Sequence, residues 1–193
     1  MHEKFIEILR TKYGELSESE TEFLKRNSII KSYRKNEIIF FAGNIQRYTY
    51  FILDGYARLF YNLQGKDKTG FFYNKGSFIW PESNQKITQR NYSCIVNSTI
   101  VLINNNHIKE LVERSSNFAH IYKLSKEEEL NNYHKLISCF VTLSPEERFR
   151  NLIKKNSSIF LNVPQQYIAS FIGVSAESFS RIKKRIYQNP LCG

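Results

Sequence analysis

Residues 107–140 constrain the fold most, because this stretch contains no Gly or Pro and is rich in helix-forming residues. Its apolar residues recur at steps of three and four, which is the spacing of one helix face. They are Ile108, Leu111, Val112, Phe118, Ile121, Tyr122, Leu124, Leu130, Tyr133, Leu136, Ile137 and Phe140. A polar break at residues 115–117 predicts a short helix followed by a long one.

The second half of this stretch offers an apolar stripe to a neighbouring element. Leu130, Tyr133, Ile137 and Phe140 have the spacing of a seam between two helices. The same spacing suits a helix that packs on the sheet of its own chain, and the charged residues at 126–129 interrupt the stripe. The residues alone leave both arrangements open.

Short aromatic and β-branched runs, separated by Gly turns, precede the helical stretch. Their near-even spacing predicts a β-roll or sandwich. The predicted strands lie within residues 37–44, 48–55, 56–67, 69–73 and 93–103. Two short amphipathic helices come first, at residues 3–10 and after Ser17, where Glu20 completes a capping box. We therefore predict an α+β chain.

The last quarter of the chain carries strong helix signals. Ser144 and Pro145 begin a helix that runs to about Lys155, and residues 160–164 are expected to be extended. Two more helices are predicted at residues 165–171 and 176–187, with Gly173 ending the first in a left-handed conformation and Ser175 capping the second. The inner face of the second helix would carry Phe179, Ile182 and Ile186.

This quarter is also strongly basic. From Arg148 to Gly193 there are eight basic residues and one acidic residue, a net charge of +7 out of +10 for the whole chain. Such a balance indicates a polyanionic partner, with DNA or RNA first, although a solvated basic tail is the alternative. Composition alone does not decide between them.

The helix that follows Ser175 has the side chains to read DNA. Arg181 can donate two hydrogen bonds to guanine, Glu177 can accept one from cytosine, and Lys184 and Arg185 suit phosphates. The full set of predicted DNA-binding residues is Gln165, Ser175, Ala176, Glu177, Ser178, Ser180, Arg181, Lys184 and Arg185. The alternative is an amphipathic helical hairpin in a core, with Glu177 and Arg181 as an ordinary i,i+4 ion pair.

Three segments together resemble the Crp/Fnr superfamily of transcription regulators, in the form common in its Bacteroidetes-type members. The segment QYIASFIGVSAESFSRI resembles the family's helix-turn-helix, GNIQRYTYFILDGYARLF its β-roll hallmark, and PEERF the start of its DNA-domain helix. The resemblance covers nearly the whole chain in the family's order. It implies a cyclic-nucleotide-binding-like β-roll (jelly-roll) at 1–114, a dimerisation helix at 115–142 and a helix-turn-helix domain at 143–193.

The resemblance further implies a homodimer that binds double-stranded DNA at a two-fold symmetric operator, with residues matching Glu177 and Arg181 reading bases. Ala176 departs from the family, because many relatives carry Arg there. The chain also ends at Gly193, before the β-hairpin of a full winged domain, so we expect the wing to be absent or reduced to the stretch before Pro164.

The family's β-roll can hold cAMP, but its phosphate cassette is altered in this chain. Trp80-Pro81 stands where the cassette has Gly-Glu, and Pro81 lacks a backbone donor. Arg90 is one residue away from the cassette's Arg position, which turns it to the other face of a strand. We expect an unidentified small-molecule effector, or none, rather than cAMP. Candidate ligand-binding residues are Trp80, Glu82, Arg90, Tyr92 and Tyr133; for Trp80 and Tyr92 a place in the core is the alternative.

Other function classes find little support. No P-loop, GxSxG, HExxH or GxGxxG motif occurs, and His2, His107, His120 and His134 lack metal-ligand spacing. We therefore expect no enzyme activity, no cofactor and no metal. The cysteines, the charged N-terminus and the lack of a long apolar run favour a cytoplasmic protein with no membrane partner. The alternative function is a dimeric ligand-sensing or protein-interaction module that has lost specific DNA binding.

Overall fold

The structure is a computed structural model that describes residues 1–82, 87–155 and 159–188. Two helices open the chain, and eight strands follow within the described residues. The opening helices are α1 (His2–Tyr13) and α2 (Glu18–Arg26). The strands are β1 (Ser28–Tyr33), β2 (Ile38–Phe40), β3 (Tyr48–Asp54), β4 (Tyr56–Leu63), β5 (Lys66–Asn74), β6 (Phe78–Ile79), β7 (Asn91–Cys94) and β8 (Ser98–Asn104).

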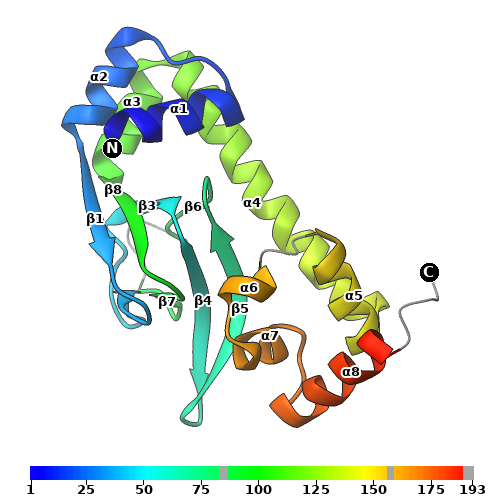
Figure 1. The fold of residues 1–193 in the computed structure, drawn as a ribbon. Helices are drawn as coiled ribbons and strands as arrows, with labels where there is room; N and C mark the ends of the chain where they lie inside the picture. The colour runs from blue at the N-terminus through cyan, green and yellow to red at the C-terminus, as the bar shows by residue number, and fades with distance from the viewer. Residues whose placement is uncertain (83–86, 156–158, 189–193) are drawn as a thin grey trace.

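Six helices complete the chain in its described part. They are α3 (Asn105–Arg114), α4 (Ser116–Thr142), α5 (Pro145–Lys155), α6 (Ile159–Asn162), α7 (Gln165–Phe171) and α8 (Ala176–Gln188). Figure 1 shows α1, α2 and α3 gathered at one end, with α4 running alongside the strands towards α5–α8 at the other end. The break predicted at residues 115–117 is confirmed, because Ser115 ends α3 and caps α4 through a hydrogen bond from the Phe118 N–H (3.0 Å).

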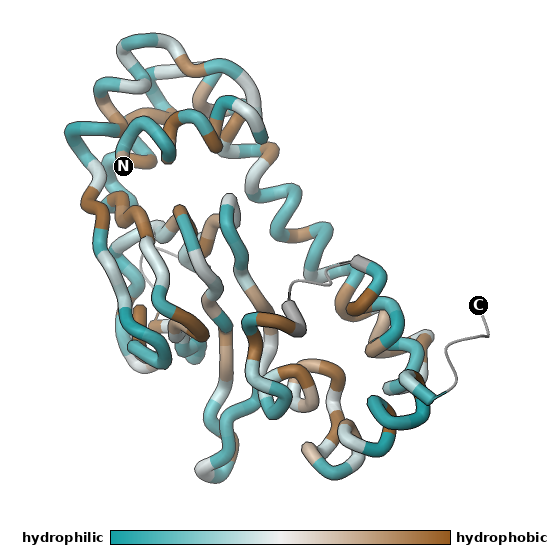
Figure 2. The backbone as a smooth tube through the Cα atoms, in the orientation of Figure 1, coloured by the Kyte–Doolittle hydropathy of each residue, from teal (hydrophilic) through white to brown (hydrophobic). Residues whose placement is uncertain are grey.

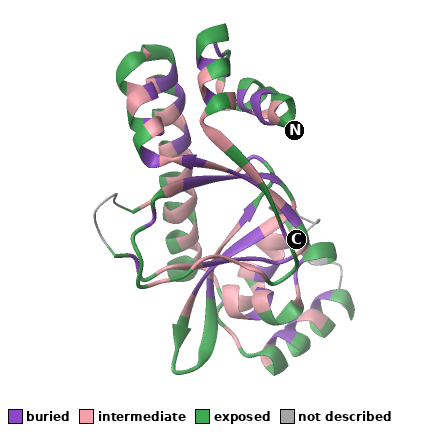
Figure 3. Cartoon of the chain, turned by 90° about the vertical axis from the view of Figure 1, so that its left-hand side faces the viewer, coloured by how far each residue is buried: buried purple, intermediate pink, exposed green. Residues whose placement is uncertain are grey.

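The strands form two antiparallel sheets that face each other as a roll. In the described residues, the sheet orders are β1-β8-β3-β6 and β2-β7-β4-β5. A core cluster that includes Tyr50, Ile52, Leu59 and Tyr92 fills the space between them. Figure 3 shows the buried residues concentrated along these strands. The predicted α+β class with an antiparallel roll is confirmed.

Two strand predictions need correction. Residues 93–103, predicted as one strand, form β7 and β8 with a turn between them. Ile95 leaves the sheet, and its side chain packs with the C-terminal helices. Residues 93–103 contain no Gly or Pro, so the sequence gives no strong signal for this turn. Strand β1 was not predicted; it is an edge strand whose Ile29 is exposed.

The opening helices and the first half of α4 share a second core cluster with the outer face of the roll, including Phe5, Phe51, Trp80 and Phe118. The capping box of α2 is confirmed, because the Glu20 N–H donates to Ser17 Oγ and the Ser17 N–H to the Glu20 carboxylate. That same carboxylate also accepts from Ser115 and Asn117. Helix α2 is thereby fixed to the start of α4.

The third core cluster joins the C-terminal helices to the roll. Phe149, Ile168 and Phe179 lie in it together with Ile95, and Tyr56 of β4 packs against it. The stretch expected to be extended before Pro164 instead contains the helical turn α6. A short apolar run does not distinguish a strand from a helical turn, which explains the error.

Candidate functional site

The turn between α7 and α8 sets the angle at which α8 leaves the molecule. The Gly173 N–H donates to the Ser170 carbonyl (3.1 Å) and the Val174 N–H to the Ala169 carbonyl (3.0 Å). These two bonds form a Schellman motif, which satisfies the last carbonyls of α7. Gly173 has a φ of +81°, a left-handed conformation that other residues adopt at a cost. The end of the helix predicted at Gly173 is confirmed.

Helix α8 begins with a serine cap, as predicted. The Ser178 N–H donates to Ser175 Oγ (3.2 Å), and the Phe179 N–H donates to the Ser175 carbonyl (2.9 Å). Hydrogen bonding from Ser175 lowers the pKa of the exposed Glu177 carboxyl. Glu177 is therefore ionised at neutral pH, in a helix turn where negative charge opposes the positive end of the dipole.

The two faces of α8 differ sharply in burial. Phe179, Ile182 and Ile186 are buried against α5 and α7 in the third core cluster. Ser178 is half-buried, and the other residues of the predicted DNA-binding set are exposed: Gln165, Ser175, Ala176, Glu177, Ser180, Arg181, Lys184 and Arg185. Figure 2 shows the α8 segment as largely hydrophilic at the outer end of the molecule. Gln165 lies apart from the rest, at the start of α7.

The basic residues on α8 are only partly engaged within the chain. Arg185 Nη2 lies 3.2 Å from a carboxylate oxygen of Glu146 on α5. In the part of the chain that the structure describes, Arg181 and Lys184 form no ion pair. A groove of about 680 Å³ beside Pro145 is lined by Arg181, Lys184 and Arg185 among others. The exposed face of α8 therefore presents cations that an external anion can reach.

Helix α7 is fixed to the roll by a buried arginine. The Arg58 guanidinium of β4 lies between the Phe60 ring (4.2 Å) and the Tyr167 ring of α7 (3.8 Å). Its Nη2 donates to Asp67 (2.7 Å), which balances the buried charge. The Thr69 N–H adds a hydrogen bond to Ser170 Oγ (2.9 Å). The sequence places Arg58 in the roll but does not predict its contact with α7, because no local signal links residues so far apart in the chain.

A second arginine connects the ends of two helices. Arg148 Nε donates to the Ile172 carbonyl (3.0 Å) at the end of α7, and Nη1 donates to the Leu143 carbonyl (2.6 Å) at the end of α4. A cation is stabilised at both places by the negative end of the helix dipole. The guanidinium also lies 4.6 Å from the Phe140 ring centre. Arg148 thus holds the end of α4 at a fixed position relative to the turn before α8.

Four of the five predicted ligand-binding residues meet between the roll and α4. Arg90 forms an ion pair with Glu82, lies close enough to Tyr92 to interact with it electrostatically, and lies over the Tyr133 ring at 5.9 Å. The hydroxyl of Tyr133 lies 2.9 Å from that of Tyr73 on β5. Arg90 and Glu82, the two charged residues among the candidate ligand-binding residues, are therefore paired with each other.

Trp80, the fifth residue, belongs to the core next to this group. It is buried, stacks on Phe78 (4.6 Å) and meets the Tyr122 ring edge-on (4.9 Å). Lys126 of α4 lies 5.1 Å from its ring centre. Trp80 and Tyr92 both occupy core positions, which is the alternative interpretation that the sequence left open for each of them.

Residues 30–115 match the family model described as cyclic nucleotide-binding domain. This part of the chain has the cyclic nucleotide-binding fold. No curated protein matches the chain at a significant level.

Solved structures extend the likeness beyond the cyclic nucleotide-binding fold. FixK2 from Bradyrhizobium japonicum superposes with a TM-score of 0.74 at 17% identity, over 86% of this chain and 87% of that one. A mutant of CooA from Carboxydothermus hydrogenoformans gives 0.72 at 15% identity, over 89% and 81%. A protein from Eubacterium rectale described as a Crp/Fnr-family transcriptional regulator gives 0.70 at 16% identity, over 90% and 84%. At these identities the likeness establishes the fold, from the roll through the C-terminal helices.

Beside the cyclic nucleotide-binding fold, α4 buries charged groups against the roll. Burial raises the pKa of Glu129, although Lys126 and Arg90 lie close enough to oppose the shift. Burial also lowers the pKa of Lys126. One carboxylate oxygen of Glu129 is buried without a hydrogen-bond partner. Burying the Glu129 carboxylate between α4 and the roll therefore costs free energy of folding.

The face of α4 that points away from the roll carries exposed apolar residues. Leu130, Ile137 and Val141 are exposed by 54%, 61% and 79%, so most of their apolar surface is left uncovered by the described residues. Tyr133, predicted as part of the same seam, is turned towards the roll, and Phe140 lies under Arg148. The predicted stripe is thus divided between two faces of the helix.

Two further findings concern the described residues only. No His, Cys, Asp or Glu side chains gather there in threes as metal ligands would. No described helix combines the length and hydropathy that a membrane span requires.

Proposed function

We propose that this chain is a sequence-specific DNA-binding transcription regulator of the Crp/Fnr type. The observation that carries the proposal is the division of α8 into two faces. A buried apolar face fixes the helix to α5 and α7, while its capped N-terminal turns present Glu177, Ser180 and Arg181 to solvent. A recognition helix needs this arrangement, because its first turns must enter the major groove.

In this proposal α7 and α8 form a helix-turn-helix. Arg181 donates two hydrogen bonds to guanine O6 and N7, and the ionised Glu177 accepts from cytosine N4. Lys184 and Arg185 contact phosphates, with Gln165 at the start of α7 near the DNA backbone. Ala176 offers no polar contact. Only Glu177 and Arg181 are assigned contacts to bases, so discrimination between base pairs rests mainly on these two side chains.

The active form is a homodimer joined along α4. Leu130, Ile137 and Val141 supply the apolar seam, at steps of seven and four that suit a coiled coil. A two-fold axis along this seam would place two α8 helices about 34 Å apart, one turn of DNA. Because DNA is the partner, we place the protein in the cytoplasm.

The effector, if one acts through the roll, is not cAMP. The pairing of Arg90 with Glu82 supports this part of the proposal, since a cyclic phosphate would have to compete with an internal carboxylate for the same cation. Pro81 also leaves that loop with one backbone donor fewer.

The test is DNA selection followed by quantitative binding. The purified chain would select its operator from a randomised duplex pool, and fluorescence anisotropy would then measure affinity at several salt concentrations. Arg181→Ala should lose about 1–3 kcal/mol of binding free energy on the selected sequence and discriminate less between bases. Lys184→Ala should weaken all sequences alike and reduce the salt slope by about one.

Arg26→Ala is the matched control, because Arg26 is an exposed arginine on α2 at the other end of the molecule. It should leave affinity unchanged. Weak binding that shows no sequence preference and disappears with salt would refute the proposal and favour a sensing or interaction module.

A further inference from the structure

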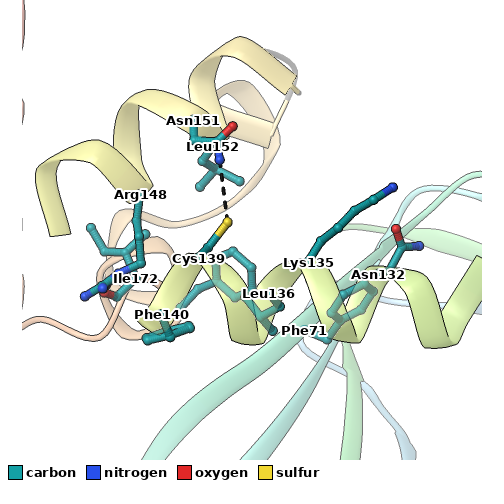
Figure 4. A pocket seen from close by; sticks show the side chains of 11 residues that line it. Phe71, Asn132, Lys135, Leu136, Cys139, Phe140, Arg148, Asn151, Leu152 and Ile172 are labelled. Atoms are coloured by element: carbon teal, nitrogen blue, oxygen red, sulfur yellow. Dashed lines mark hydrogen bonds between the residues drawn. The ribbon is translucent and has the colours of Figure 1, made fainter. Parts of the chain in front are cut away.

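A cavity of about 270 Å³ lies where α4, α5, α7 and β5 meet. It is separate from the Arg90–Glu82 group, none of whose residues lines it. Figure 4 shows its side chains converging from the end of α4, from α5 and from Phe71 of β5. The cavity therefore borders the end of α4, two of the C-terminal helices and the roll at once.

The chemistry of the cavity wall is unusual for a chain with 18 acidic residues. Most of the surface is apolar, from Phe71, Leu136, Leu152, Phe171 and Ile172. The polar side chains are two amides, one thiol and two cations, Lys135 and Arg148, and the lining contains no carboxylate. An apolar body with a negative group complements such a wall.

Arg148 is the better placed of the two cations. Its Nε and Nη1 are fixed by the Ile172 and Leu143 carbonyls, so the plane of the guanidinium is held without an incoming ligand. Within the described residues, Nη2 has no hydrogen-bond partner and no carboxylate pairs with the group. A fixed guanidinium with a free N–H pair is a prepared donor for a carboxylate oxygen.

Lys135 lies at the opposite end of the cavity from Arg148, on a long side chain that extends outwards (Figure 4). It has no ion pair in the described part of the chain. Its positive charge adds to that of Arg148 and favours an anion at this side of the molecule.

A second copy of the chain would leave the cavity open. Lys135 and Cys139 are each two residues away from Ile137, and residues two apart on a helix point about 200° apart. The exposed stripe of Leu130, Ile137 and Val141 therefore lies on the other side of α4 from these cavity residues. A partner helix on the stripe and a small molecule in the cavity do not compete.

We propose that this cavity is a binding site for a small carboxylate with an apolar body. The carboxylate contacts Arg148, and the apolar part lies between Phe71, Leu136, Leu152 and Phe171. A ligand in this position bridges α4, α5 and α7, so it favours one orientation of α8 over others. Binding is independent of the function proposed above, whereas any effect on operator affinity rests on that function.

The experiment titrates the full-length chain with decanoate below its micelle concentration, by isothermal calorimetry. Decanol and decylammonium are the matched probes, because they carry the same chain with a neutral or positive end. Saturable decanoate binding is expected, with affinity at least about tenfold above that of decanol and of decylammonium. Equal affinity for all three probes would reduce the cavity to an unselective apolar surface and overturn the proposal.

Variants locate the site. Arg148→Gln should weaken decanoate binding by at least about tenfold, and Lys135→Gln by a smaller factor. Arg150→Gln and Lys123→Gln are the matched controls on α5 and α4, since neither residue lines the cavity. Because Arg148 also holds two helix ends, its variant would first be checked for folding by circular dichroism. If Arg148→Gln does not fold, the Lys135→Gln variant and the comparison of the three probes test the proposal instead.

Cys139 supplies an independent readout. Its thiol lines the cavity and accepts a hydrogen bond from the Asn151 amide (3.5 Å), while Cys94 is buried. In a Cys192→Ser background, decanoate should slow alkylation of Cys139 and decylammonium should not. An alkylation rate that decanoate leaves unchanged would contradict the proposal. DNA anisotropy measured on the same samples separates the two claims, because decanoate binding without operator binding would refute only the regulator.

Discussion

Replacing Tyr167 with Leu should weaken the attachment of the C-terminal helices to the roll. The Arg58 guanidinium lies over the Tyr167 ring at 3.8 Å and over the Phe60 ring at 4.2 Å. Leu keeps an apolar contact at this position but removes the aromatic face. Because Arg58 is only 4% exposed, the lost cation–π interaction belongs to the desolvated class and is worth about 1–2 kcal/mol.

The assay is urea unfolding followed by circular dichroism, with the free energy of unfolding extrapolated to water. Tyr187→Leu is the control, since Tyr187 is an exposed tyrosine on α8 and its loss should cost less than about 0.5 kcal/mol. A double-mutant cycle with Arg58→Met isolates the pair, and a coupling of about 1 kcal/mol is expected. Coupling within about 0.3 kcal/mol of zero would show that the two side chains do not interact in solution.

Three other substitutions test separate features by the same unfolding assay. Gly173→Ala forces a Cβ into a left-handed turn (φ +81°) and to 3.0 Å from the Phe140 ring, so it should cost about 1–2 kcal/mol; an unchanged stability would argue against this turn. Phe149→Ala empties a fully buried site beside Phe179 and should cost about 3–5 kcal/mol, whereas a loss below about 1 kcal/mol would contradict the burial. Because burial raises the pKa of Glu129, the folded state holds its proton more tightly than the unfolded chain, and stability falls as the pH rises through the range between the two values. The Glu129→Gln variant should therefore have a free energy of unfolding about 1 kcal/mol higher than that of the unsubstituted chain at pH 7, and the same value near pH 3. A gain in stability seen only at low pH would contradict the direction of the pKa shift.

Local signals predicted the C-terminal helices closely. Ser144, Gly173 and Ser175 each act on backbone groups a few residues away, so their effects can be read without knowing the rest of the fold. The inner face of α8 followed from the spacing of Phe179 and Ile182, because both the helical period and the burial of one face are properties of the segment itself.

Contacts between distant segments could not be predicted in the same way. The positions of Arg58 against Tyr167, and of Arg148 between the ends of α4 and α7, depend on how separate elements meet. The cavity beside Arg148 was missed for the same reason, since its wall is assembled from residues between Phe71 and Ile172. For Arg58 a signal did exist, because an arginine inside an aromatic strand needs a counter-charge and Asp67 follows it in the next strand.

The division at Tyr133 shows the limit of periodicity. Leu130, Tyr133 and Ile137 follow one spacing in sequence, yet Tyr133 contacts the roll whereas the other two face outwards. Helix α4 has 27 residues and touches the curved roll along only part of its length. Some of its apolar residues therefore pack against the roll, and others face away from it. Spacing identifies apolar positions, but which partner each one meets is a tertiary property.

The third core cluster determines where the chain can be divided into fragments that still fold. Ile95 contributes a fully buried side chain to the interior beneath α5, α7 and α8, and Tyr56 and Phe72 border it. A fragment that began at Ser144 would expose this interior to water and lack the chain segment that closes it. The C-terminal helices are thus not an independent folding unit, because their interior is completed by residues that lie some fifty to ninety positions upstream of Ser144. A substitution at Ile95, Tyr56 or Phe72 should therefore destabilise α8 directly, through the shared core.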